Sequence, residues 1–182
     1  MKGINMQLIQ CTKKLADMME LKTEKVDQRE SNNLHSWHAN LFTINRKKCV
    51  IVMNNVTRYH FIIYGVTKKD LRNFEALFQK NLVTNLLSDG VEPEVIEHYV
   101  KSSSPMQYAA TNNRSILSQM NDAVFMVDHY FYAELVEKQK PFINIEKLNQ
   151  NLNKTVMLKI PKYPADMMRD ALNQHLIMSK NE

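Results

Sequence analysis

The sequence of 182 residues is long enough for one domain with a sizeable core, and its 44% hydrophobic and 24% charged residues are typical of globular chains. This composition excludes a disordered or fibrous protein, and three glycines leave no Gly-rich loop for a nucleotide phosphate. The net charge of +5 is uneven: residues 1–70 hold 12 basic against 6 acidic side chains, and residues 71–182 hold 12 against 13. The N-terminal excess favours a polyanionic partner, although solvated surface lysines explain it as well.

We expect a cytoplasmic protein with no membrane partner and no cofactor. The apolar runs are shorter than the roughly 18 to 20 residues of a membrane span, and the N-terminus lacks the apolar region and cleavage site of a signal peptide. Cys11 and Cys49 form no CxxC pair, so we expect both to be free thiols.

The first half of the chain predicts strands. Residues 6–11 alternate apolar and polar side chains as a half-buried strand does, Thr12 is a candidate N-cap for a helix to Met19, and residues 21–33 are a polar surface loop. Three runs rich in β-branched and aromatic residues then predict an antiparallel meander: residues 37–44, 49–53 and 59–64.

Helices dominate the remainder. Thr67 and Asp70 indicate a capping box before an amphipathic helix to Leu86. Further helices are predicted for residues 93–100, for residues 113–140 with a break near Asp128, for 145–153 and for 164–178, and short strands for 106–110 and 155–160.

We therefore predict an α+β fold in one domain of residues 1–182. Its antiparallel sheet is built on residues 36–64, joined by the strands at 6–11, 106–110 and 155–160, with helices packed on one face. One core should combine residues of the meander and of the following helix: Trp37, Cys49, Phe61, Leu71, Phe74 and Phe78.

Four motifs carry a resemblance: CTKKL (residues 11–15), WHANL (37–41), RKKC (46–49) and NRSILSQMND (113–122). Their order and separation resemble those of an uncharacterised bacterial family of small domains of unknown function. Ser118 departs from its pattern, which has a small residue, often glycine, at this position. The likeness covers about residues 6–130 and leaves a helical extension of about 131–182. It implies a shared fold and shared polar positions, without a reaction.

The meander supplies one group of candidate residues. Alternation places His38 and Asn40 on the face opposite Trp37, where they could orient a ligand or move a proton; alternatively, they bond to neighbouring backbone. His38, Cys49 and His60 could converge as metal ligands, but without a short ligand pair we expect no metal.

The NRSILSQMND motif supplies a second group. Arg114 at a positive helix terminus could bind a phosphate or carboxylate. The structural alternative is an ion pair between Arg114 and Asp122. The polar residues of this group are Asn113, Arg114, Ser115, Asn121 and Asp122.

The third group is the basic turn of Arg46, Lys47 and Lys48, which lies in a stretch, residues 31–69, without any Asp or Glu. Our leading hypothesis is a non-catalytic binding module for an anionic partner, with nucleic acid first. The sequence leaves the oligomeric state open.

Two alternatives stand beside this hypothesis. One is a small enzyme acting on a phosphorylated or nucleotide substrate through His38, Arg46, Arg114 and Asp122, although Ser115 and Cys49 have no recognisable base partner. The other is a protein-interaction accessory factor of a mobile element, for which the sequence offers no direct sign. A buried pocket joining His38 to Arg114 would favour the enzyme, and a flat basic sheet would favour binding.

Overall fold

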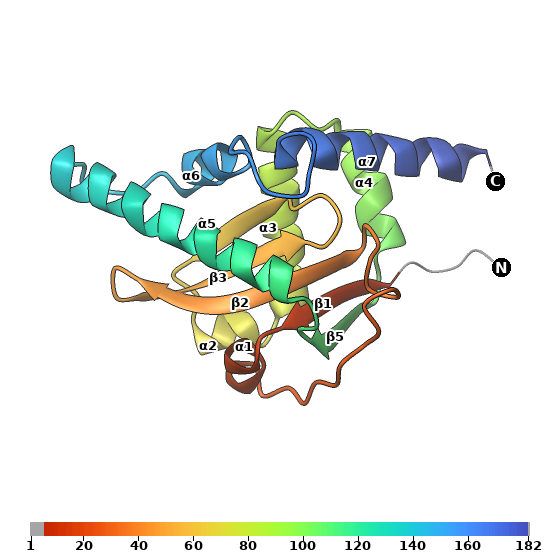
Figure 1. The fold of residues 1–182 in the computed structure, drawn as a ribbon, viewed down its shortest axis with the longest axis horizontal. Coiled ribbons are helices and arrows are strands. Elements are labelled where there is room, and N and C mark those ends of the chain that lie inside the picture. Colours follow the sequence, from red (N-terminus) through yellow and green to blue (C-terminus); the bar gives the residue numbers. More distant parts are fainter. Residues whose placement is uncertain (1–5, 182) are drawn as a thin grey trace.

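The computed structural model describes residues 6–181, and its five strands form one sheet in the order β4-β3-β2-β1-β5 (Figure 1). The N-terminal residues 1–5, which entered the signal-peptide argument, lie outside this range. The strands are β1 (Gln7–Cys11), β2 (Ser36–Ile44), β3 (Lys47–Asn54), β4 (His60–Tyr64) and β5 (Met106–Ala110). β2, β3 and β4 form the predicted antiparallel meander.

The sheet is mixed, so the prediction of a purely antiparallel sheet is wrong beyond the meander. β1 is parallel to both its neighbours, with Gln10 opposite His38 of β2 and Ala109 of β5. A parallel pair needs a crossover connection. The helix α1 (Lys13–Met18) and the polar loop that follows it make the crossover from β1 to β2, and Lys25 in this loop adds a single parallel bridge to Ala110.

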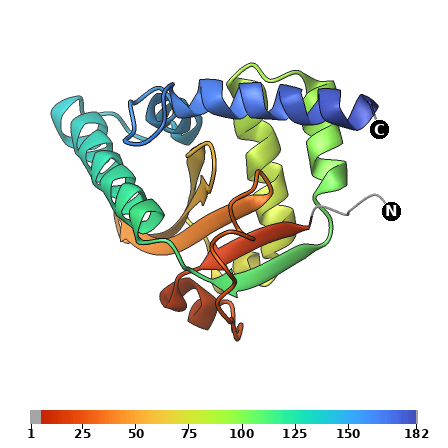
Figure 2. The same cartoon turned by 45° about the vertical axis from the view of Figure 1, so that its right-hand side comes forward.

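Helices cover both faces of the sheet, whereas one face was predicted (Figure 2). After β4 the helices are α2 (Lys68–Leu71), α3 (Phe74–Ser88), α4 (Pro93–Ser102), α5 (Arg114–Tyr132) with a π-helical turn (Ala133–Glu137), α6 (Ile145–Leu152) and α7 (Pro164–Lys180). α3 and α4 pack on one side and α5 on the other, while α7 lies across one end. The continuous apolar run Cys49–Met53 of β3 is typical of a strand buried on both faces.

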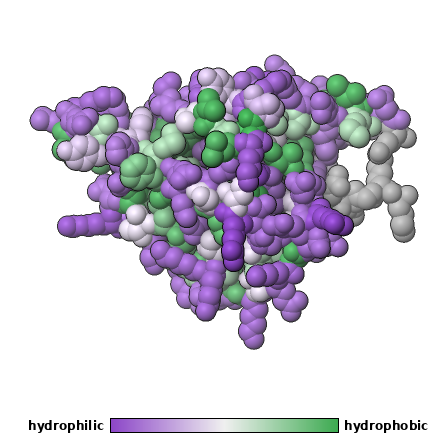
Figure 3. Space-filling model, viewed as in Figure 1, coloured by the Kyte–Doolittle hydropathy of each residue, from purple (hydrophilic) through white to green (hydrophobic). Residues whose placement is uncertain are grey.

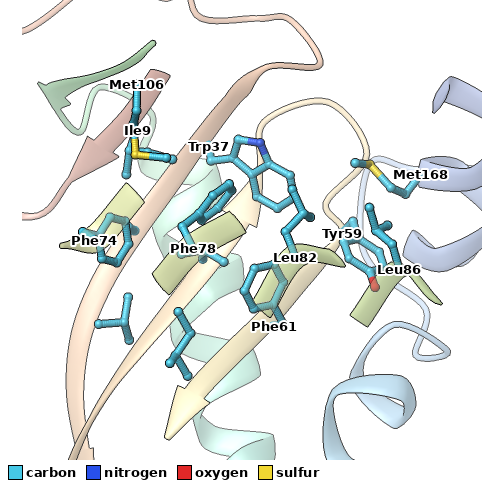
Figure 4. Packing of buried hydrophobic residues seen from close by; sticks show 14 of the residues in the cluster. Ile9, Trp37, Tyr59, Phe61, Phe74, Phe78, Leu82, Leu86, Met106 and Met168 are labelled. Atoms are coloured by element: carbon cyan, nitrogen blue, oxygen red, sulfur yellow. The ribbon is translucent and has the colours of Figure 1, made fainter. Parts of the chain in front are cut away.

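The first core lies between the sheet and α3, α4 and α7. Trp37 meets Phe78 edge-on, with ring centroids 5.2 Å apart, and Phe61 and Phe74 pack in the same group (Figure 4). The indole Nε1 of Trp37 donates to the hydroxyl of Tyr99 at 3.2 Å, which satisfies its buried N–H. Five of the six residues predicted for one core are therefore together.

The sixth, Cys49, belongs to a second core beneath α5 and α6, because it lies on the other face of β3. This core contains side chains of β2, β3 and β4 against two helices: Phe42, Ile44, Ile51, Met53 and Ile62 with Ile116, Met120, Ala123, Val127, Phe131, Leu148 and Leu152. Cys11 lies in the first core, and both cysteines are free thiols, as predicted.

α6 covers the edge of β4 by hydrogen bonds from two asparagine side chains. The amide of Asn149 accepts from the backbone N of Ile62 at 2.9 Å and donates to its O at 3.2 Å. Asn153 does the same with His60, at 3.0 and 2.6 Å. The two asparagines thus replace a sixth strand, which is one way to protect a sheet edge.

Several local predictions need correction. Residues 155–160 are an irregular segment and not a strand, and the helix does not break near Asp128 but changes to the π-helical turn after Tyr132. The Thr67 capping box is confirmed, but its helix ends at Leu71 and α3 starts separately at Phe74. Among residues 6–181, no helix is long and apolar enough to cross a membrane.

Candidate functional site

Two of the residues or groups predicted for a site, His38 and the basic turn, lie at opposite ends of β2. His38 is near the start of the strand, opposite Met53, whereas Arg46 lies in the turn after Ile44 and Lys47 begins β3. Six residues of strand separate His38 from Ile44, which corresponds to about 20 Å. His38 and the basic turn therefore do not belong to one small-molecule site.

His38 lies on the face opposite Trp37, as predicted, but it is completely buried there on the α5 side of the sheet and does not face solvent. Its Nδ1 lies 2.7 Å from Oδ1 of Asn55. An amide oxygen only accepts, so Nδ1 carries the hydrogen and Nε2 keeps a lone pair, for which the described residues provide no partner. Burial lowers the pKa of His38 to about 4, with a smaller contribution from the charge of Arg58, so the ring is neutral near pH 7.

Asn55 connects this histidine to the neighbouring strand and to the polar loop. Its Nδ2 donates to Oε1 of Gln10 at 2.7 Å and to the backbone O of Ser31 at 2.8 Å. Gln10 is also completely buried, and its Nε2 lacks a partner within residues 6–181. Sequence reasoning missed Gln10 and Asn55. The only signal was that each is a polar residue at or just after the end of a mostly apolar strand.

A pocket of about 290 Å³ lies beside this network, between the polar loop, the β3–β4 turn and the start of α5. Its lining residues are mainly amides and cations: Gln28, Arg29, Ser31, Asn32, Asn55, Arg58, Asn113 and Ile116. Asn113 caps α5, because its Oδ1 accepts from the backbone N of Ser115 and Ile116 at 3.0 and 3.2 Å. Of the predicted site residues, Asn113 lines this pocket. His38 is connected to it indirectly, through its hydrogen bond to Asn55.

The remaining residues of the NRSILSQMND motif point elsewhere. Arg114 is exposed outside the lining of this pocket and forms no ion pair with Asp122 within the described chain, so the alternative of an internal ion pair is wrong. Ser115 accepts a hydrogen bond from Lys159 at 3.1 Å. Asn121 and Asp122 are exposed, and Asp122 lines a separate hollow beside His60. The described pockets therefore do not join His38 to Arg114.

Asn40, in the middle of β2, has a structural contact. Its Oδ1 accepts from the hydroxyl of Thr12 at 2.9 Å, which ties the start of α1 to the sheet. Thr12 consequently does not cap α1 with its side chain.

A second region, which we call the basic corner, gathers exposed cations from three segments: Lys13 and Lys14 of α1, Arg46, Lys47 and Lys48 of the β2–β3 turn, and Lys68, Lys69 and Arg72 at α2. α1 and α2 lie side by side at the lower edge of the sheet (Figure 1). Nζ of Lys48 is 3.7 Å from Sδ of Met18, and its backbone O accepts from Val66 at 2.8 Å, so the three segments are in contact.

The turn of this corner projects its side chains outward. Asn45 and Arg46 have φ values of 47° and 59°, as in the type I′ turn that joins two strands with two residues. The carboxylate of Asp70 accepts hydrogen bonds from the backbone N and the hydroxyl of Thr67, at 2.8 and 2.6 Å. The corner cations form one ion pair within the described chain, Lys68 with Glu20 at 2.5 Å.

Residues 6–181 contain no group of three His, Cys, Asp or Glu side chains arranged to hold a metal ion. His38, Cys49 and His60 do not converge: His38 bonds to Asn55, the thiol of Cys49 donates to the backbone O of Lys47 at 3.6 Å, and Nδ1 of His60 bonds to the O of Arg58 at 2.7 Å.

A mixed five-stranded sheet with helices on both faces defines this chain as an α+β protein with two polar surface regions. The chain belongs to the family described as "Domain of unknown function (DUF6933)", whose model matches residues 8–167. The match extends beyond the expected limit near residue 130 and includes α6 and the start of α7. No curated protein and no solved structure matches the chain. The family description assigns no function.

Proposed function

We propose that the chain is a non-catalytic nucleic-acid-binding module that contacts the phosphate backbone through the basic corner. The observation that carries the proposal is that three separate segments bring eight exposed cations together. Within residues 6–181, only Lys68 of these cations forms an ion pair. Phosphate contacts by Lys and Arg supply most of the affinity of sequence-independent binding.

The rest of the surface provides the comparison. On the helices of the second half of the chain, cations are repeatedly paired: Lys101 with Glu97, Lys138 and Lys140 with Glu134, Lys162 with Asp170, Arg169 with Asp166, and Lys180 with Glu94. The field of these cations is offset by their partners. In the basic corner only Lys68 has such a partner within residues 6–181, so the charges of the other seven cations attract a polyanion to this part of the molecule.

The chemistry of the corner favours duplex over single-stranded nucleic acid. Single-strand binders combine cations with exposed aromatic side chains on which bases stack. The exposed large apolar residues of the described chain lie elsewhere, among other places on α5, in residues 156–163 and on α7, and none belongs to the corner. On the face shown in Figure 3, green hydrophobic patches are most visible on the upper part of the molecule, whereas the lower part is mostly hydrophilic.

The test removes three cations together. We expect the triple variant Arg46→Gln/Lys47→Gln/Lys48→Gln to bind a mixed-sequence DNA duplex at least about 10-fold more weakly at low salt, as measured by fluorescence anisotropy. Since each phosphate contact contributes about −0.9 to the slope of the log of the association constant against log salt, the loss of three contacts should flatten that slope by two to three units.

A matched control carries the same change in net charge elsewhere. Lys80, Lys147 and Lys154 are exposed on α3 and near α6, so their triple replacement by Gln should alter duplex affinity by less than about threefold. Equal losses of duplex affinity in both triple variants would show that only the net charge of the protein matters, and would contradict binding at the basic corner. An unmodified protein that binds neither duplex nor single strands at low salt would overturn the proposal.

A further inference from the structure

We propose that the pocket beside Arg58 is a second, independent site, which binds the oxyanionic group of a small molecule, a phosphoryl or a carboxylate group. It lies at the opposite end of β2 from the basic corner.

The side chain of Arg58 is the central cation of this pocket. The residue lies in the turn between β3 and β4 with φ of 59°, a conformation that non-glycine residues adopt rarely and that often marks functional positions. Its Nε donates to Oε1 of Gln119 at 2.6 Å, and Nη1 donates to the backbone O of Asn55. Both acceptors are neutral, and they fix the guanidinium in one orientation.

No carboxylate of residues 6–181 pairs with this guanidinium, and its Nη2 makes no hydrogen bond to the described chain. The side chain is half-buried, and burial lowers the pKa of Arg58, which reflects the unfavourable environment of the charge. A partly buried cation without a counter-ion is destabilising, and a bound anion would offset this penalty. The free donors of an oriented guanidinium suit the oxygens of a phosphate or carboxylate.

The other residues around this pocket also favour an anion. Arg29 supplies a second cation to the lining, and no lining residue is acidic. The backbone N of Arg29 donates to Oδ1 of Asp27 at 2.7 Å, so this neighbouring carboxylate is bonded to the loop itself. The N-terminus of the 19-residue helix α5 borders the pocket through Asn113 and adds a positive dipole end.

The walls are held in place by hydrogen bonds to the residues just before α5 and just after β3. Nε2 of Gln28 donates to the backbone O of Asn112 at 2.7 Å, and the loop at Ser31 is tied to Asn55. Beneath Asn55 lie the buried, unpartnered Nε2 atoms of His38 and Gln10. A volume of about 290 Å³ is at the lower end for small-molecule sites and too small for a polymer, so we infer a small metabolite.

The experiment is isothermal titration calorimetry at constant ionic strength with three probes: inorganic phosphate, glycerol phosphate and succinate. We expect at least one probe to bind saturably with a stoichiometry of one. If the phosphate probes bind more tightly than succinate, the site prefers a phosphoryl group, and the reverse order indicates a carboxylate. Arg29→Gln, in an exposed loop, should weaken binding at least about 10-fold without unfolding the protein. Arg58→Lys keeps the positive charge but loses the planar, forked arrangement of guanidinium N–H donors, so it should weaken binding more than Arg29→Gln does.

Arg46→Gln at the far end of β2 is the matched control and should leave the affinity unchanged. If the probe affinity falls in Arg46→Gln but not in Arg29→Gln and Arg58→Lys, the anion binds at the basic corner and the proposal is wrong. No saturable binding of any probe up to about 20 mM would also overturn it. Duplex affinity, measured separately, should be the same in Arg29→Gln as in the unmodified protein, so the two sites can fail independently.

Discussion

Three buried histidines are neutral in the folded protein for the same physical reason. Burial lowers the pKa of His35, His38 and His60 to about 4, and for His35 the neighbouring rings of His175 and His98 add to the effect. His35 Nδ1 bonds to the hydroxyl of Ser103 at 3.0 Å, and its Nε2 lies 3.1 Å from Nε2 of His175, so this contact ties the start of β2 to α7.

These shifts predict that stability falls on mild acidification. In the unfolded chain the histidines take up protons near pH 6.5, whereas in the folded protein they do so near pH 4, so the unfolded state binds more protons between these values. The free energy of unfolding should therefore be constant above about pH 7 and fall from pH 6.5 toward pH 4. The slope is at most about 1.4 kcal/mol per pH unit for each histidine.

Urea unfolding between pH 5 and pH 7.5 measures this slope above the range in which carboxylates titrate. His35→Gln should flatten it, whereas replacement of the exposed His129 by Gln should not. An unchanged slope in His35→Gln would show that protons are taken up elsewhere.

Sequence reasoning placed His38 correctly opposite Trp37 but could not tell what covers it. Alternation along a strand fixes the face of a side chain, because successive residues point to opposite faces. Which helix packs on that face is decided by contacts distant in sequence, here those of α5 with β2 and β3. Asn55 was missed because an Asn after a strand reads as a turn residue, and only the fold brings it to His38 and Gln10.

At the scale of elements, the pairing of α6 with β4 makes a testable prediction. Asn149→Ala leaves the buried N–H and C=O of Ile62 without partners, and Asn153→Ala does the same at His60. We expect each variant to lose about 1 to 3 kcal/mol of unfolding free energy in urea melts. The double variant exposes a strand edge and should self-associate, as measured by light scattering.

Asn151 on the same helix gives a matched control because its exposed side chain has no hydrogen bond to residues 6–181. Asn151→Ala should stay within about 0.5 kcal/mol of the unmodified protein. Equal effects at positions 149 and 151 would trace the loss to helix α6 as a whole and contradict the edge pairing.

The same edge explains why the strand prediction for residues 155–160 is wrong. The alternation of Val156, Leu158 and Ile160 satisfies the local pattern of a strand, but a strand also needs a free edge on which to pair. Asn149 and Asn153 already bond the edge of β4, and Val156 and Leu158 remain 76% and 78% exposed. The meander and the amphipathic helices were predictable because their signals are local. The insertion of β1 between β2 and β5 was not, because strand order depends on contacts distant in sequence.

At the scale of the molecule, the two anion-binding proposals use opposite ends of one sheet. β2 carries His38 toward the pocket and ends at the turn of the basic corner. The sheet therefore separates the two cation groups by its own length, which keeps their mutual repulsion weak, since a separation of about 20 Å exceeds the screening length of about 8 Å at physiological salt.

The prediction of one domain for residues 1–182 can be examined with the two cysteines, because each reports on one core. Cys11 lies beneath the α3 side and Cys49 beneath the α5 side. Burial raises the pKa of Cys11 to about 12 and also raises that of Cys49, so neither thiol reacts readily in the folded protein. β2 and β3 contribute alternate side chains to both cores, so loss of one core should remove the other.

We expect pulsed alkylation along a urea gradient, read by peptide mass spectrometry, to label both cysteines with the same midpoint. Cys11→Ser and Cys49→Ser serve as controls that each label reports its own site. Without reductant, the unfolded protein should take two labels, because the thiols lie on opposite faces of the sheet. If Cys49 becomes reactive at a lower urea concentration than Cys11, the α5–α6 side unfolds separately, and the chain behaves as two cooperative units joined by one sheet.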